Sequence, residues 1–254
     1  MGLLDFQTAM GRLVRTPNGG DPLRSLHLDE RERASLAALK ESSGYQFTVG
    51  VQRSWCVGRA KNAGYLTLSV LSEDVRSRML DEWTNCGGGT SSFFAAETEA
   101  FLDFIAERLL DPSHELTACR LEQATMRASE GVATFLAPEL DLLEEPGCVL
   151  RRGCHAGVVR FYGEPERILN GLVNHENLPP VSVAAEVIML FGPGLEQLCC
   201  AASPRQMDLW ERVSSGVELT ALMREGYRRD EIATMLGGGV VELSVAESGV
   251  AKLS

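Results

Sequence analysis

Residues 203–243 read SPRQMDLWERVSSGVELTALMREGYRRDEIATMLGGGVVEL, and this stretch decides the fold expected for the C-terminal part of the chain. Its first helix pattern begins at Ser203, whose hydroxyl suits an N-cap position. Pro204 fits the first helical turn, and Gln206 stands where the second half of a capping box is expected. The sequence therefore predicts a helix that starts just after Ser203.

Two further helices and a strand are predicted downstream. A short helix is expected over residues 218–224 and a third over 230–236, with Asp230 as the N-cap of the third. The glycine triplet at 237–239 is expected to end this helix, and residues 240–243 follow it as a strand. The stretch is thus predicted to form a helical trio with a final strand.

Upstream of the trio, the pattern favours strands. Residues 148–152 and 156–162 flank a turn-like Gly-Cys-His sequence at 153–155, which predicts a β-hairpin. A short helix is expected over 165–173 and a third strand over 181–191. A small antiparallel sheet packed on three helices is the arrangement of a winged helix. The expected fold class is therefore α+β, with a winged-helix-like C-terminal domain.

The N-terminal half is predicted to be largely helical, because its apolar residues recur at three-to-four-residue spacing. Asp29, followed by Glu30 and Glu32, marks one capped helix start. The predicted helices cover residues 3–14, 30–39, most of 45–83, 93–109 and 111–131. We expect three parts: a helical domain over residues 1–145, a winged-helix-like domain over 146–245, and a flexible tail over 246–254.

Composition and charge narrow the classes of function. The net charge of −11 repels a phosphate backbone, so no nucleic-acid partner is expected. The longest apolar stretch, 181–191, is interrupted by polar residues and too short to span a bilayer, so no membrane association is expected. The start of the chain lacks a signal-peptide pattern, and the seven cysteines are an odd number. These features predict a cytoplasmic protein with free thiols.

Cysteine and histidine offer two alternative chemistries, and neither has a supporting pattern. Cys148, Cys154, Cys199, Cys200 and His155 are residue types that suit zinc, yet no Cys-x-x-Cys pair occurs. A catalytic pair of Cys154 and His155 would need the imidazole oriented on the thiol, which neighbours in a strand do not achieve. Buried thiols are the plainer interpretation. We therefore expect no metal and no catalytic residue in this chain.

Short segments resemble a known family. They are DPSHELTACRLEQA at 111–124, MLFGPG at 189–194, the Ser-Pro pair at 203–204, and LWER at 209–212. In these segments the chain resembles the TglI-like partner proteins of multinuclear non-haem iron oxygenases, which act in peptide natural-product biosynthesis, with the MbnC-like proteins more distant. The resemblance covers most of the chain in pattern, through short motifs.

The resemblance implies a non-catalytic subunit of a heterodimer. Its partner would be a TglH-like iron oxygenase that holds the iron ions and excises the β-carbon of a C-terminal cysteine on a carrier peptide, so no cofactor is expected in this chain. The C-terminal domain would act as a RiPP recognition element for that ribosomally made, TglA-like peptide. The helical N-terminal domain would contact the oxygenase, and Arg120 and Glu122 are the contact residues expected, although such charges are often simply solvated.

Carried onto this sequence, the resemblance places peptide binding between the third strand and the third helix of the trio. The peptide would add a strand to an unpaired sheet edge next to an apolar groove. The expected peptide-binding residues are Ala185, Val187, Met189, Phe191, Glu231, Ile232 and Met235. The apolar members are equally compatible with a simple hydrophobic core.

Two other functions remain open from the sequence. A winged helix also fits a DNA-binding regulator, although its third helix begins with Asp230 and Glu231, where a DNA-reading helix is usually basic. A thiol-dependent enzyme would require a cysteine with a strongly lowered pKa.

Overall fold

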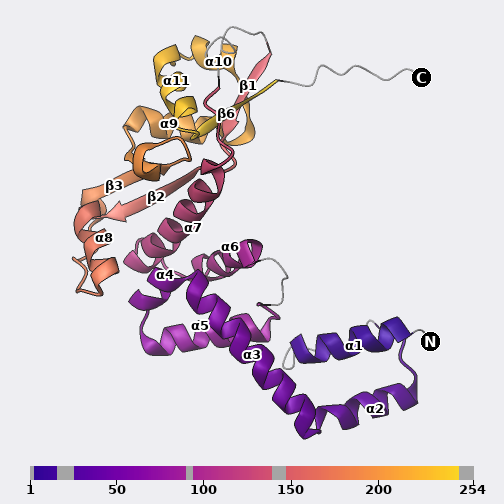
Figure 1. Ribbon diagram of the computed structural model, residues 1–254. Helices are drawn as coiled ribbons and strands as arrows, with labels where there is room; N and C mark the ends of the chain where they lie inside the picture. The colour runs from indigo at the N-terminus through magenta and orange to yellow at the C-terminus, as the bar shows by residue number, and fades with distance from the viewer. Residues whose placement is uncertain (1–2, 16–25, 90–93, 139–146, 246–254) are drawn as a thin grey trace, which may run out of the picture. The chain divides into compact units, whose positions relative to one another are not determined.

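The computed structural model describes residues 3–15, 26–89, 94–138 and 147–245. The chain forms two compact units, Met1–Leu110 and Asp111–Ser254. Helices and two small antiparallel sheets confirm the expected α+β class (Figure 1). The expected tail at 246–254 lies outside the described residues. No described helix is both long and apolar enough to cross a membrane.

Unit 1 consists of helices in its described part, as its apolar periodicity predicts. Their bounds are α1 Leu3–Arg15, α2 Glu30–Lys40, α3 Ser43–Ala63, α4 Tyr65–Val70, α5 Glu73–Asn85 and α6 Phe94–Ala106. Helix α2 begins at the predicted N-cap Asp29, and the structure adds a capping box there, because Asp29 accepts from the backbone of Glu32 and the Glu32 side chain accepts from the backbone of Asp29. The hydroxyl of Tyr45 ties α3 to α1 by donating to the Leu13 carbonyl at 2.8 Å.

Unit 2 combines five α-helices with six strands in its described part. The helices are α7 His114–Val132, α8 Pro165–Asn174, α9 Pro204–Arg212, α10 Leu219–Arg224 and α11 Arg229–Gly237. The strands are β1 Cys148–Arg152, β2 Gly157–Tyr162, β3 Glu186–Phe191, β4 Cys199–Ala201, β5 Val217–Glu218 and β6 Val241–Val245. The capping box at Ser203 and Gln206 starts α9 as predicted, whereas the N-cap of α11 is Arg228, two residues before the predicted Asp230.

The strands form two sheets rather than one, and this corrects the predicted hairpin. One sheet has the order β5-β1-β6 and the other has the order β2-β3-β4. The turn at 153–155 therefore carries the chain from one sheet to the next, so β1 and β2 do not pair. Local turn composition could not reveal this, because the partners of both strands come from much later in the sequence.

Helix α7 belongs with unit 2, because it packs along β2. A side chain on Gly157 would bring its Cβ within 2.9 Å of the Ala124 Cβ, so only glycine permits this close approach. Thr117 donates from its hydroxyl to the Arg160 carbonyl at 2.8 Å. The division between the units at residue 110 therefore differs from the boundary expected at residue 145.

The hydrophobic core of unit 2 gathers the helical trio onto the β5-β1-β6 sheet. Side chains that are almost fully buried come from every part of this assembly: Leu150, Leu190, Leu209, Leu222, Ile232, Met235, Leu236 and Val241. Each such side chain contributes roughly 1.5–3 kcal/mol by leaving water. This packing gives α9, α10, α11 and β6 fixed positions around the candidate sites.

Candidate functional site

The groove expected between β3 and α11 is not formed as predicted. Strand β3 is the central strand of its sheet, with β2 on one side and β4 on the other. Its backbone is paired on both sides along residues 188–191, because the amide of Ala202 also donates to the Ile188 carbonyl. An added peptide strand needs an unpaired edge, so β3 is unsuited to this role.

The predicted peptide-binding residues also point in different directions. Leu190 packs in the core cluster with Ile232 and Met235, whereas Val187 and Met189, one position out of phase on β3, belong to the opposite sheet face. Phe191 shares that opposite face and is buried. Ala185 is exposed in a short 3-10 turn before the strand.

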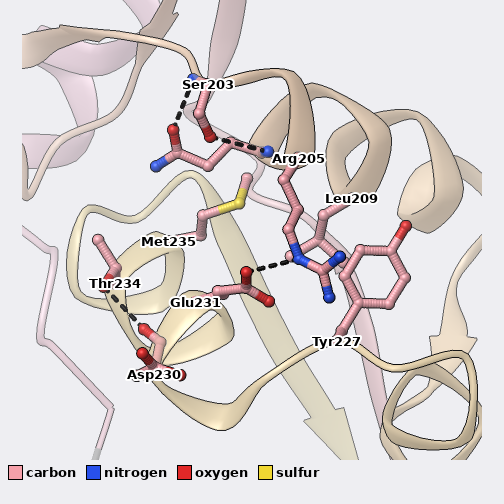
Figure 2. Close-up of a pocket in the computed structure, with 9 residues that line it drawn as sticks. Ser203, Arg205, Leu209, Tyr227, Asp230, Glu231, Thr234 and Met235 are labelled. Carbon is pink, nitrogen blue, oxygen red and sulfur yellow. Dashed lines mark hydrogen bonds and ion pairs between the residues drawn. The ribbon is translucent and has the colours of Figure 1, made fainter.

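A small pocket does lie where Glu231 and Met235 were expected to act, but α9 forms its other wall (Figure 2). Its volume is about 230 Å³. The Arg205 guanidinium pairs with Glu231 at 2.5 Å across the gap and also lies over the Tyr227 ring. The backbone amide of Arg228, followed by Arg205, lowers the pKa of Glu231. These charged groups satisfy each other and hold α9 against α11.

Other charges near the trio pair in the same way. Arg212 makes a two-pronged contact with Glu225 at 2.6 and 3.0 Å. Arg228 pairs with Asp230 at 2.5 Å. Most of the positive charge near α11 is therefore already matched by carboxylates of the same unit, which does not favour the alternative of a DNA-reading helix.

Arg120 and Glu122 lie on α7 in unit 2 rather than in the helical unit. Arg120 is exposed, donates to the Gln123 side chain at 2.8 Å, and lines a notch of about 190 Å³ with Arg160 and Tyr162. Glu122 is half-buried. The oxygenase-contact role expected for the two residues stays a prediction.

A larger apolar pocket lies beside β6, and among its lining residues the sequence had singled out Cys154 and His155 only, for other chemistry. Its volume is about 370 Å³, and its lining residues come from the end of α7, the 153–155 turn, the end of α11 and β6. The apolar side chains on its walls are Phe135, Leu136, Pro138, Pro193, Leu236, Val241 and Leu243. A cavity of this size accommodates one or two side chains of a ligand.

Close backbone contacts build one wall of this pocket. A Cβ on Gly153 would lie 2.3 Å from the Gly239 carbonyl oxygen, so the two glycines let the backbone segments touch. Gly239 itself has a φ of +67°, a left-handed conformation that favours glycine. The glycine triplet thus ends α11, as predicted, and also packs against the turn between the two sheets.

Strand β6 is one of the two edge strands of its sheet, and its residues 241–243 line the pocket. The amide of Gly153 donates to the Val240 carbonyl, which fixes the alternation of the β1–β6 ladder. The backbone groups of Glu242 and Ser244 then face β1, and those of Val241 and Leu243 face outward. Among the described residues, these outward groups have no backbone partner. Three consecutive residues of β6 line the pocket, as expected when a pocket borders a strand edge.

Three thiols of unit 2 have raised pKa values. Burial, and then the Glu242 carboxylate, raise the pKa of Cys154, although this residue and His155 both line the pocket. Burial also raises the pKa of Cys199 and Cys200. A raised pKa leaves less thiolate at neutral pH, which does not favour the alternative of a thiol-dependent enzyme. Within the described ranges, no three His, Cys, Asp or Glu side chains gather as a metal site requires.

Unit 1 carries a separate exposed surface on α3. Phe47, Val51 and Trp55 follow one another at four-residue spacing, and 73%, 53% and 64% of their surfaces are exposed. We call these three residues the α3 stripe. One turn further along α3, Arg59 forms an ion pair with Glu97, and burial raises the pKa of this carboxyl.

The chain matches no protein-family model, no curated protein and no solved structure.

Proposed function

We propose that this chain is a non-catalytic subunit that binds a ribosomally made carrier peptide and presents it to an iron-dependent oxygenase. The observation that carries the proposal is the open edge of β6 beside the apolar pocket. The resemblance to TglI-like partner proteins supplies the partner class, a TglH-like oxygenase that excises the β-carbon of a C-terminal cysteine. The iron and the oxidation would belong to that partner.

Peptide binding at β6 would proceed by strand addition. The outward N–H and C=O groups of Val241 and Leu243 offer a peptide two donors and two acceptors. The apolar pocket gives one peptide side chain a place to leave water. Main-chain hydrogen bonds then supply affinity for any extended segment, and the pocket supplies selectivity. This places recognition at β6 in place of the interior strand β3.

The α3 stripe is the surface we propose for the oxygenase subunit. Exposed aromatic side chains in a row are uncommon on a monomer and are enriched at the centres of protein interfaces. Two of the three cations of α3 are already paired within unit 1, Arg53 with Asp81 and Arg59 with Glu97. A partner with an exposed apolar patch would therefore match this helix.

Peptide recruitment is tested by fluorescence polarisation of a labelled candidate carrier peptide against the full chain. Leu243→Pro removes one outward N–H without removing a ladder bond, since that N–H faces away from β1. We expect binding to the wild type and at least a tenfold weaker Kd for this variant. Leu136→Ala, at a residue that is 87% exposed, should weaken binding about threefold with no loss of stability.

Ser214→Ala, on the exposed surface away from β6, serves as the matched control and should bind as the wild type does. Equal affinity of Leu243→Pro, Leu136→Ala and the wild type would exclude the β6 edge as the peptide site. No binding of the carrier peptide by the wild type would remove the recruiting role.

Assembly is tested by co-expression with a candidate TglH-like subunit. Trp55→Ser should abolish co-purification, because it removes the largest side chain of the α3 stripe. Leu110→Ser, at a residue that is 82% exposed outside the stripe, should have no effect. Undiminished co-purification of Trp55→Ser would place the contact elsewhere.

A further inference from the structure

The pocket beside β6 has one charged group at its mouth, the carboxylate of Glu242. The side chain is exposed, and one of its oxygens accepts from the backbone amide of Cys154 at 3.2 Å. Its cross-strand neighbour on β1 is Arg151, whose side chain lies against Gly216 on the other side of β1. The carboxylate therefore faces the pocket with room for a further donor.

Glu242 differs from the arginine-paired carboxylates of unit 2. In the described part of unit 2, five acidic side chains form ion pairs with arginine: Glu186, Glu211, Glu225, Asp230 and Glu231. Among the described residues, no cationic partner is found for Glu242. Other exposed carboxylates described in this unit, such as Glu166, also have no arginine partner, so what distinguishes Glu242 is its place at the edge-strand pocket.

The distribution of charge over the whole sequence also favours a cationic ligand at this unit. Residues 111–254 contain 21 acidic and 12 basic side chains, a balance of −9, whereas residues 1–110 contain 14 and 12, a balance of −2. Most of the net charge therefore lies in the unit that carries β6. A negative field attracts cationic ligands and repels anionic ones during encounter.

We propose that the segment recognised at β6 is a basic-apolar peptide: an extended stretch with one apolar residue for the pocket and a Lys or Arg within two positions of it that pairs with Glu242. This inference rests on the proposed function, because it specifies the ligand of the same site. A strand added to β6 places its side chains opposite those of Val241, Glu242 and Leu243. One face of the peptide can therefore fill the pocket while a flanking cation meets the carboxylate.

The test is selection from a random dodecapeptide display library on the full chain. The wild type should enrich peptides that carry a basic residue within two positions of a large apolar residue. Glu242→Gln keeps an acceptor for the Cys154 amide but removes the charge, and it should raise the Kd of the enriched peptides about fivefold. Glu242→Lys should shift the enrichment from basic to acidic peptides.

Glu166→Gln is the matched control, because it removes an exposed carboxylate from α8 and changes the net charge equally. This variant should leave the Kd unchanged. A Kd that rises equally in both variants would show that only the overall field acts, and this result would overturn the inference about Glu242.

The two proposals fail in different ways. Peptides enriched without a basic residue, whose binding is lost in Leu243→Pro but not in Glu242→Gln, would overturn the basic-apolar class and leave recruitment at β6 intact. Enrichment that is the same for the wild type and for Leu243→Pro would overturn the β6 site itself.

Discussion

The two sheets of unit 2 each have three strands, but the edge strands β2 and β6 have different surroundings. The outer side of β2 is covered by α7, with Thr117 bonded to the Arg160 carbonyl and the amide of Ser182 bonded to the Tyr162 carbonyl. The outer side of β6 borders a pocket instead. Exposed edges invite pairing with other chains, and proteins usually cover them. In the part of the chain that the structure describes, the outward backbone groups of β6 have no backbone partner, and the proposed peptide site rests on this difference from β2.

The largest expected effect comes from forcing α7 away from β2. Gly157→Val places a branched side chain against Ala124, so the free energy of unfolding should fall by about 3 kcal/mol, as measured by urea denaturation. Gly237→Ala, where a Cβ meets nothing within 4 Å, should change it little or increase it slightly. Equal stability of Gly157→Val and wild type would mean that α7 is not packed on β2.

Amide hydrogen exchange compares the two edges directly. The outward amides of Val241 and Leu243 should exchange at least about tenfold faster than the paired amides of Glu242 and Ser244. The outward amides of Val158 and Arg160 should exchange more slowly than those of β6, because α7 covers them. Uniform protection along β6 would show that its edge is already paired. Saturating peptide should slow the exchange at Val241 and Leu243 alone.

Removing one hydroxyl from the covered edge has a smaller expected effect. Thr117→Val keeps the shape of a buried side chain and leaves the Arg160 carbonyl without its 2.8 Å bond, which should cost about 1 kcal/mol in thermal or urea unfolding. Thr48→Val removes a similar hydroxyl on the exposed surface of α3 and should cost less. An equal loss of unfolding free energy in the two variants would indicate that the hydrogen bond from Thr117 to the Arg160 carbonyl does not stabilise the protein.

The last expected effect is confined to alkaline pH. Burial, followed by the hydrogen bond to Asp111, raises the pKa of Tyr162 from its ordinary value of 10.0 to about 12. A raised folded-state pKa stabilises the protein fully below pH 10, and that stability is lost as the pH rises from 10 through 12. Tyr162→Phe should therefore lose less stability across this window. A steeper loss in the variant would contradict this assignment.

Several elements were predictable because their determinants are local. The N-cap at Asp29 and the capping box at Ser203 and Gln206 depend on neighbouring residues only, and both are present as predicted. The apolar periodicity of the N-terminal half likewise predicted the helices of unit 1. Strands β1, β2 and β6 fall within a residue or two of their predicted ranges, as does the helix at 165–173.

The predicted peptide-binding groove between β3 and α11 differs from the structure, because a groove is built by residues that lie far apart in the chain. The run at 181–191 does contain a strand, but β2 and β4 enclose it on both sides. A one-residue difference in phase places Leu190, rather than Met189, in the core with Ile232. The pocket at Phe135 and Leu136 had no motif to reveal it, since its walls come from four separate segments.

The sequence by itself determined the α+β class, most helix starts and the excess of negative charge, because capping, periodicity and charge are properties of neighbouring residues or of simple counts. Only the tertiary structure decided that two sheets form instead of one, that α7 joins unit 2, and that the outward backbone groups of β6 have no backbone partner among the described residues. These outcomes depend on which distant strands pair and on where glycines let backbones approach. Such contacts are selected by packing over the whole unit, and no local pattern specifies them.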